Sequence, residues 1–599
     1  MAIRSARLAA RETARLTSER ARNIALSLPL IGAAIPFAPL PLTIAIAVGC
    51  AMWTLKLDRD DQEADKPLVW DRKYVQGDLE DCDFQRSTFL GKTMPWVEWK
   101  ERIDTVVNER GVATADDVRQ SLIEAYPSMI PFMLSDDIMT RHMALLAATG
   151  TGKTELILAI AQQQIKKGAG FLLVEAKADT DLSGAIYGMM AAAGRLDQFK
   201  LISFEFPEIS HTYNPFFSGG ARTTLSTAMK VQAASKEEFW TDVARYSLSA
   251  AILCMKLQPG EPAFHIKDMI AVLSDFDLFL TYVDAIREAD SEDHKDGKEF
   301  LLSYLRFWRD EDQESWDRKK YKNLLQGTIS KLSAFAHSEY SRIVNTYSPD
   351  VELKDAILNG EVVVLSMSAL ADQDGVALMG KLFISDLARA IGEIQLQKLK
   401  PLMICPAIFD EYGSFADESQ ITLFQLARSA NVPIIIAFQG VGFLQQRSAP
   451  FVEMVLGNCW TQIYCDIRDA ETRAFACKLA GTTIRKYEQE SEGSSTGASH
   501  SSEQSGLIAN ENVGSSTSIG TKATREDLLQ PDDFQTLDEG DGVIVAKSGT
   551  YRVRMPIVRN NFAATHFRDM KLCRRQSRGR VGIHAWDKFT KRNREILLG

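Results

Sequence analysis

The segment Ala147-Ala-Thr-Gly-Thr-Gly-Lys-Thr154 constrains the fold of this chain more than any other. It lies between an apolar run at 143–147, typical of a buried strand, and an apolar-faced run that begins at Glu155, typical of a helix. Glycines at 150 and 152 permit positive φ angles, so the backbone N–H groups of the turn can surround an anion at the helix amino terminus. This context predicts a phosphate-binding loop, although the first glycine of the usual pattern is Ala147 here.

Backbone, cation and metal ligand have separate roles in such a loop. Lys153 is expected to reach the β- and γ-phosphates of a nucleotide, and the Thr154 hydroxyl to bind Mg²⁺. A glycine-rich turn that binds no ligand is the alternative interpretation. The predicted nucleotide-binding residues are the consecutive set Ala148, Thr149, Gly150, Thr151, Gly152, Lys153, Thr154 and Glu155.

Two adjacent carboxylates follow a second apolar run, Ala407-Ile-Phe409. Asp410 is expected to hold Mg²⁺ through water, and Glu411 to polarise the water that attacks the terminal phosphate. An Asp-Glu pair after a strand is a weak signal by itself, because such pairs also begin helices. Together with Lys153 it predicts that the chain hydrolyses ATP with Mg²⁺ as the metal cofactor.

Two further side chains are candidates for catalysis. Gln439 follows the apolar run 434–438, and an amide at that strand end can sense the γ-phosphate. Arg428 can reach the phosphate of a neighbouring subunit as an arginine finger. An ordinary loop glutamine and a helix-surface arginine are the alternatives. The predicted catalytic set is Lys153, Glu411, Gln439 and Arg428, with Thr154 and Asp410 as metal ligands.

The amino end has the charge pattern of a membrane anchor. Residues 4–22 carry six arginines and two glutamates, whereas residues 24–57 contain one charged side chain. Three prolines at 36, 39 and 41 would break a helix in the middle of the apolar stretch. We therefore expect a transmembrane helical hairpin at 24–57, with the arginine-rich start and the rest of the chain in the cytoplasm. A single tilted span and a buried apolar hairpin are the alternatives.

The overall charge argues against one class of protein. At 599 residues with a net charge of −10, the chain is not a bulk binder of nucleic acid, so any such contact must come from local basic surface. The tail from Arg559 onward carries eleven Lys and Arg residues against three acids. Such a tail can bind a phosphate backbone or an acidic lipid surface, and a merely solvated tail is an equal alternative.

Strand-like and helical segments alternate through most of the chain, except between about 223 and 345, where helical periodicity dominates. Apolar runs that alternate with helices indicate a mostly parallel α/β sheet covered on both faces. The predicted strands are 143–147, 170–175, 200–204, 360–365, 402–409, 432–437 and 460–465, with a closing hairpin at 541–547 and 551–555.

These patterns divide the chain into successive regions. The predicted regions are a basic arm at 1–23, the transmembrane hairpin at 24–57, a membrane-proximal connector at 58–133, the first part of the nucleotide-binding domain at 134–222, an all-α domain at 223–345, the second part of the nucleotide-binding domain at 346–558 with a flexible Ser- and Gly-rich loop at 489–522, and a basic tail at 559–599.

With both nucleotide motifs placed, the chain resembles the type IV coupling proteins, the ATPases of conjugation and type IV secretion that are related to the FtsK and HerA DNA pumps. It looks nearest to the Dot/Icm and TrbC branch of this TraD/TraG-like superfamily. The segments that carry the resemblance are Ala148-Thr-Gly-Thr-Gly-Lys-Thr-Glu155, Gly170-Phe-Leu-Leu-Val-Glu-Ala-Lys177, Asn214-Pro-Phe216, Phe239-Trp240 and Phe409-Asp-Glu-Tyr-Gly413.

The resemblance implies a RecA-like nucleotide domain with an inserted all-α domain, assembled as a homo-hexamer around a channel. It also implies a multi-pass protein of the bacterial inner membrane, in contact with lipid and with inner-membrane components of the secretion channel. The chain ends soon after the closing hairpin, where effector-delivering branch members carry a long extension, and this favours conjugative DNA transfer.

Three hypotheses for function follow. The first is an ATP-driven motor that recruits a relaxase and its single-stranded DNA and drives transfer to the channel. The second is a docking receptor for protein effectors, in which ATP hydrolysis acts as a gating switch. The third is a membrane-tethered translocase of duplex DNA.

Overall fold

The computed structural model describes most of the chain from residue 86 onward. All described residues except Ile557 and Val558 belong to one of the chain's two units, which spans 81–556 and 562–599, and this unit is described below. The described ranges are 86–110, 114–232, 237–288, 295–310, 315–496, 513–558, 569–574 and 580–598.

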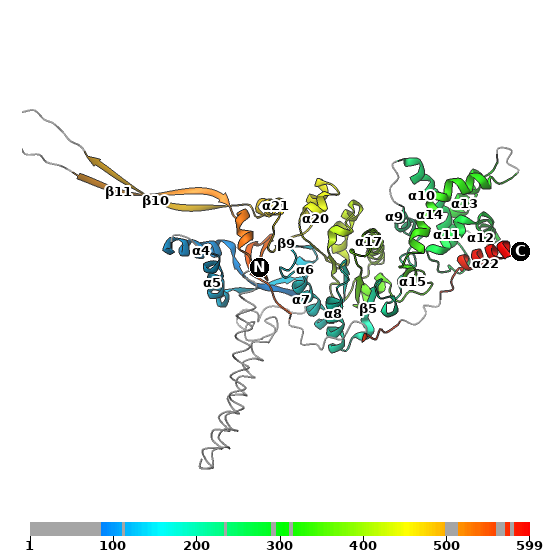
Figure 1. Ribbon diagram of the computed structural model, residues 1–599, viewed down its shortest axis with the longest axis horizontal. Coiled ribbons are helices and arrows are strands. Elements are labelled where there is room, and N and C mark those ends of the chain that lie inside the picture. Colours follow the sequence, from blue (N-terminus) through cyan, green and yellow to red (C-terminus); the bar gives the residue numbers. More distant parts are fainter. Residues whose placement is uncertain are drawn as a thin grey trace, which may run out of the picture. The chain divides into compact units, whose positions relative to one another are not determined.

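A single mixed sheet of eleven strands organises the described part of this unit, in the order β2-β1-β13-β12-β9-β3-β8-β7-β4-β6-β5 (Figure 1). The half from β9 to β5 is parallel throughout, and every residue of its strands is buried, as expected when helices cover both faces. The predicted α/β fold class is therefore confirmed. The parallel strands are β3 Met143–Leu146, β4 Phe171–Glu175, β5 Phe199–Ser203, β6 Val362–Ser366, β7 Ala407–Asp410, β8 Ile434–Phe438 and β9 Thr461–Tyr464.

The other half of the sheet is antiparallel and combines segments from both ends of the sequence. The hairpin of β12 (Asp541–Ala546) and β13 (Gly549–Arg554) joins β9 on one side and β1 (Ser87–Pro95) on the other. β1 then pairs with β2 (Ile130–Ser135). The segment predicted as a connector thus extends the sheet of the nucleotide domain.

Between β5 and β6 the described chain forms helices and no strand. The helix α10 packs against α9 and against each helix from α11 to α14, so these elements share one core. Aromatic rings fill that core: the Tyr304 ring lies 5.4 Å from Phe279, and Trp308 lies 4.8 Å from Tyr321. The helices of this region are α9 Ala221–Val231, α10 Glu238–Lys256, α11 Ile266–Ser274, α12 Phe276–Glu288, α13 Lys295–Phe307, α14 Arg318–Ala336, α15 Ser341–Val344 and α16 Leu353–Asn359.

The remaining helices accompany the sheet and its connections. They are α4 Trp96–Arg110, α5 Ala115–Ala125, α6 Asp136–Met139, α7 Lys153–Lys166, α8 Thr180–Ala192, α17 Gln373–Leu396, α18 Ile421–Leu426, α19 Gly442–Gln445, α20 Ala449–Gly457, α21 Ala470–Ala480 and α22 Ala585–Leu598.

A two-stranded ribbon occupies most of the segment predicted as a flexible loop at 489–522. β10 (Thr482–Thr496) pairs with β11 (Val513–Asp527) in an unbroken antiparallel register, and Figure 1 shows the ribbon leading away from the sheet. Residues 497–512 lie outside the described ranges. The two strands satisfy each other's backbone hydrogen bonds, so the ribbon forms without the apolar periodicity that marks a buried strand.

The described parts of the basic tail pack on the sheet-containing part and on the helical region. The Tyr187 hydroxyl accepts a hydrogen bond from Lys571 N, and the Cys573 carbonyl lies 3.1 Å from His211 Nε2. Further along, α22 packs against α11 of the helical region, as the red helix in Figure 1 shows. Arg592 there lies 3.4 Å from an Asp275 oxygen and 3.0 Å from an Asp277 oxygen.

For the described residues, the expected multi-pass localisation in the bacterial inner membrane is wrong. Across the ranges that the structure describes, no helix is both long enough and apolar enough to span a bilayer. α17 has 24 residues, but it carries charged side chains such as Lys381, Arg389 and Glu393, which a spanning helix avoids. The hairpin expected at 24–57 lies outside the described residues.

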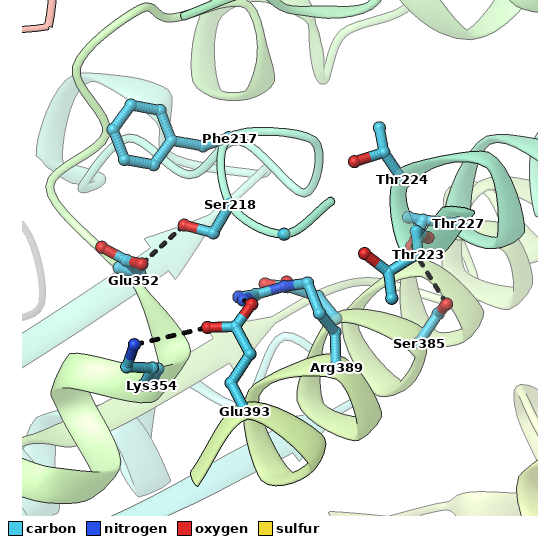
Figure 2. Close-up of polar contacts among 12 residues, drawn as sticks. Phe217, Ser218, Thr223, Thr224, Thr227, Glu352, Lys354, Ser385, Arg389 and Glu393 are labelled. Atoms are coloured by element: carbon cyan, nitrogen blue, oxygen red, sulfur yellow. Dashed lines mark hydrogen bonds and ion pairs between the residues drawn. The ribbon is translucent and has the colours of Figure 1, made fainter. Parts of the chain in front are cut away.

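A buried ion pair within α17 also contacts Tyr213 and Lys354, which lie outside this helix. Arg389 Nε lies 2.7 Å from Asp386 Oδ1, both side chains are almost fully buried, and the Tyr213 hydroxyl donates to the same carboxylate at 2.9 Å. Glu393 completes the group 2.6 Å from the Arg389 guanidinium, one turn further along the helix, with Lys354 facing it (Figure 2). Each charge here depends on its partners, because an isolated buried charge is costly.

We expect Asp386→Asn to lower the free energy of unfolding by about 3 kcal/mol, because it leaves the buried Arg389 with Glu393 as its remaining carboxylate partner. Urea denaturation followed by circular dichroism measures this change. The control is Asp284→Asn, which removes an exposed pair with Arg287 and should cost less than about 1 kcal/mol. Equal effects of the two substitutions would contradict the assignment.

Candidate functional site

The phosphate-loop segment has the backbone shape of an anion cradle. β3 ends at Leu146 and α7 begins at Lys153, so the segment forms the turn between them. Gly150 and Gly152 have φ angles of 80° and 104°, which residues with a side chain rarely adopt. Because Gly152 is the amino cap of α7, the free N–H groups of the first helical turn open toward the loop.

Neighbouring strands hold this turn in place. Ala147 N donates to the Phe438 carbonyl at the end of β8, and Ala148 N donates to the Asp466 carbonyl just after β9. On the other side, Gly540 N donates to the Thr151 carbonyl at 3.1 Å, so the start of the closing hairpin touches the loop. This last contact joins segments almost 400 positions apart and could not be read from the motif.

The acidic pair reaches the loop from two strands away. β8 lies between β3 and β7, and the three strands are parallel, so their carboxyl ends meet at one edge of the sheet. At that edge Lys153 Nζ lies 2.8 Å from Asp410 Oδ1 and 2.6 Å from Glu411 Oε1. Lys153 is 5% exposed and Asp410 3%, so this is a buried cluster of charges.

A second lysine also contacts Glu411. Lys177 Nζ lies 2.5 Å from Glu411 Oε1, the same oxygen that Lys153 contacts. Burial alone would raise the pKa of Glu411, but the two lysines outweigh it and hold the pKa below its usual range. Partial burial works to lower the pKa of Lys177, and Glu411 and Asp410 raise it instead. Both groups are therefore charged at neutral pH.

The other predicted site residues take different places. Gln439, directly after β8, points its amide at Glu411, with Nε2 3.4 Å from Oε2. Thr154 and Glu155 lie in the first turn of α7. Beside the loop is a cavity of about 640 Å³, and its polar lining includes Thr149, Gln439 and Arg468.

Arg428 is not brought to this cluster within the chain. It lies in a short 3₁₀ turn, Ala427–Ala430, that precedes β8, whereas the cluster lies at the opposite, carboxyl end of that strand. Its side chain is half exposed and lies 3.8 Å from Asp137. Arg428 can therefore act on a nucleotide only if that nucleotide belongs to another subunit.

His142 ties the amino end of β8 to the helix before Arg428. Its Nδ1 accepts a hydrogen bond from Ile434 N at 3.0 Å, and its Nε2 lies 2.6 Å from the Phe424 carbonyl. Burial, with a smaller contribution from the positive charge of Arg428, lowers the pKa of His142 to about 4, although the hydrogen bond to the Phe424 carbonyl opposes this shift. The imidazole is thus neutral at pH 7, with its proton on Nε2, as both hydrogen bonds require.

Lys177 is the residue at this site that sequence reasoning missed, together with Arg468 beside the cavity. Lys177 follows β4, the strand next to β7, so its position depends on the order of strands in the sheet. The sequence segment 170–177 was prominent for its resemblance to a family, but it gave no indication that its lysine meets an acid more than 230 positions away. The position of Lys177 just past a buried parallel strand is the one signal that could have marked it as a site residue.

Comparisons with known proteins find a matching family model and a curated relative. A family model described as the TraM recognition site of TraD and TraG matches residues 405–539, which include the acidic pair and Gln439. The type 4 coupling protein DotL of Legionella pneumophila is 25% identical over 466 residues. That match covers 70% of this chain, and the chain spans 58% of the length of DotL.

Solved structures of similar shape include two of coupling proteins. The bacterial conjugative coupling protein TrwBΔN70, in an unbound form, matches with a TM-score of 0.47 and 14% identity over 75% of this chain and 88% of its own. The plasmid coupling protein TrwB in complex with a non-hydrolysable ATP analogue matches with a TM-score of 0.47 and 14% identity over 83% of this chain and 98% of its own.

The resemblance predicted from the sequence is confirmed by the family model and the curated relative, and these matches relate the chain to the type IV coupling proteins.

Proposed function

We propose that this chain is the ATP-hydrolysing coupling protein of a conjugation or type IV secretion system. The observation that carries the proposal is the meeting of Lys153 with Asp410 and Glu411 at the open end of the phosphate loop. The predicted roles of these residues need them in one place, and they come from segments 258 positions apart. The proposed domain is RecA-like, with β8 lying between β3 and the acidic strand β7.

The residues present fit a nucleotide with Mg²⁺. The positive φ angles of Gly150 and Gly152 leave the loop N–H groups free for phosphate oxygens, and Lys153 supplies a cation next to them. Thr154 and Asp410 provide a hydroxyl and a carboxylate, the oxygen ligands that Mg²⁺ prefers. Mg²⁺ held by these two residues would supply positive charge to offset the negative charge that develops on the phosphate during hydrolysis.

The residues of the chain then divide the hydrolytic step. Lys153 exchanges its carboxylate partners for the nucleotide phosphates, because the phosphates carry more negative charge. Glu411 accepts a hydrogen bond from the attacking water and orients it toward the terminal phosphate. Gln439 lies between Glu411 and the cavity beside the loop, where its amide can report the presence of that phosphate. In a proposed homo-hexamer, Arg428 of one subunit would reach the site of the next.

The proposed cargo is a relaxase with its single-stranded DNA, delivered to the components of a secretion channel. The family model that covers 405–539 is named for recognition of TraM, and this supports contact with the machinery of DNA transfer. Protein effectors and duplex DNA are the competing cargoes, and a docking receptor or a duplex translocase would carry them.

We expect Lys153→Ala to reduce ATP turnover at least about a hundredfold and to weaken nucleotide binding, because the loop loses its cation. Phosphate release and titration with a fluorescent nucleotide measure the two effects. The matched control is Lys230→Ala, which removes a lysine paired with Asp417 away from the loop and should leave turnover unchanged. Normal turnover by folded Lys153→Ala would overturn the assigned site.

ATP hydrolysis measured across protein concentration, with single-stranded DNA, duplex DNA or neither, tests the cargo. We expect single-stranded DNA to stimulate turnover several-fold, and turnover per subunit to rise with concentration as subunits complete one another's sites. Equal stimulation by duplex DNA would favour the translocase. A turnover rate that neither nucleic acid changes would favour the docking receptor. The stimulation should weaken steeply as salt is raised, because phosphate contacts release counterions.

A further inference from the structure

Two lysines from opposite sides share one oxygen of Glu411. Lys153 reaches it from α7, after β3, and Lys177 reaches it from the turn after β4. Because the sheet order runs β3, β8, β7, β4, the elements that carry the two lysines lie on opposite sides of β7. Lys153 also pairs with Asp410, so the two lysines balance two carboxylates. Charge balance alone does not explain why both lysines contact the same oxygen of Glu411.

The backbone that carries Lys177 is held rigidly. The buried carboxylate of Glu175 accepts hydrogen bonds from Lys177 N at 2.9 Å, from Asp179 N and from the Ser366 hydroxyl. Ala178 adopts a left-handed conformation with φ of 51°, and its N–H donates to the Met367 carbonyl at 2.8 Å. The turn is thereby fixed to both β4 and β6, and the Lys177 side chain extends from a fixed base.

Glu411 depends on contacts from other residues to keep its conformation. Its φ angle of 53° places it in the left-handed region, which a glutamate adopts only when its surroundings require it. Its carboxylate is held by Lys153, by Lys177 and by the longer contact from Gln439. Two of these three contacts come from residues with another role in the proposed reaction, and phosphate binding removes the one from Lys153.

We propose that Lys177 is a positioning residue that keeps Glu411 aimed at the attacking water once Lys153 has moved to the nucleotide phosphates. This inference rests on the proposed function of the site. Lys177 does not touch the nucleotide in this assignment; it acts through Glu411 alone. Its side chain is 42% exposed, so replacing it removes a contact without emptying a packed core.

The test separates catalysis from binding. We expect Lys177→Gln to lower kcat about tenfold while the dissociation constant of a fluorescent nucleotide changes less than about twofold. Lys177→Arg keeps the positive charge and should recover part of the lost kcat. The control Lys319→Gln, an exposed lysine on α14 of the helical region, should match the wild type. The proposal would be overturned if kcat is unchanged in Lys177→Gln. It would also be overturned if the dissociation constant rises by the same factor by which kcat falls.

A double-mutant cycle with Glu411→Gln tests the route. If Lys177 acts through Glu411, adding Lys177→Gln to Glu411→Gln should leave the small residual turnover unchanged. A further tenfold loss in the double variant would show that Lys177 acts on something else. Failure of the wider functional assignment has a different signature, since the wild-type protein would then hydrolyse no ATP at all.

Discussion

The contact of Lys153 with Asp410 and Glu411 is the interaction on which the rest of the site depends. It brings together the ends of two parallel strands that are separated by β8 in the sheet and by the entire helical region in the sequence. Burying one ammonium and two carboxylates costs desolvation free energy that the ion pairs offset only in part. The cluster therefore contributes to the preorganisation of the site more than to the stability of the fold. Its net negative charge is corrected by Lys177.

The local parts of this site follow from the sequence because each depends on a few neighbouring residues. The glycines of the loop, the apolar strand before it and the acids after Phe409 carry their own conformational signals. The order of the strands does not, since it depends on which buried surfaces pack best over the entire sheet. Lys177 and the contact of Gly540 with Thr151 belong to this second kind, and sequence reasoning missed both. Gln439 falls between, because its strand was predicted but its distance to Glu411 was not.

The outer parts of the described fold differed from expectation for a related reason. The ribbon of β10 and β11 has few apolar residues, so hydrophobic periodicity gave no sign of it. In the tail, the basic residues suggested a phosphate or lipid surface, yet Arg592 is paired with Asp275 and Asp277. Arg574 likewise lies 3.1 Å from Asp350. A count of charges along the chain cannot show which of them meet an opposite charge in the fold, and here part of the positive charge is used internally.

The strand β8 has a consequence for how neighbouring copies of the chain could influence one another. Gln439 directly follows the last residue of β8. The first residue of β8, Ile434, donates a hydrogen bond to the imidazole of His142, which also contacts the Phe424 carbonyl. The five residues of β8 are paired with β3 on one side and with β7 on the other, so the sheet holds the two ends of the strand in a defined relation. The strand therefore connects the amide of Gln439 at one end to the turn that holds Arg428 at the other. In the proposed homo-hexamer, this strand would be the connection between the nucleotide pocket of one copy and the guanidinium that faces the next copy.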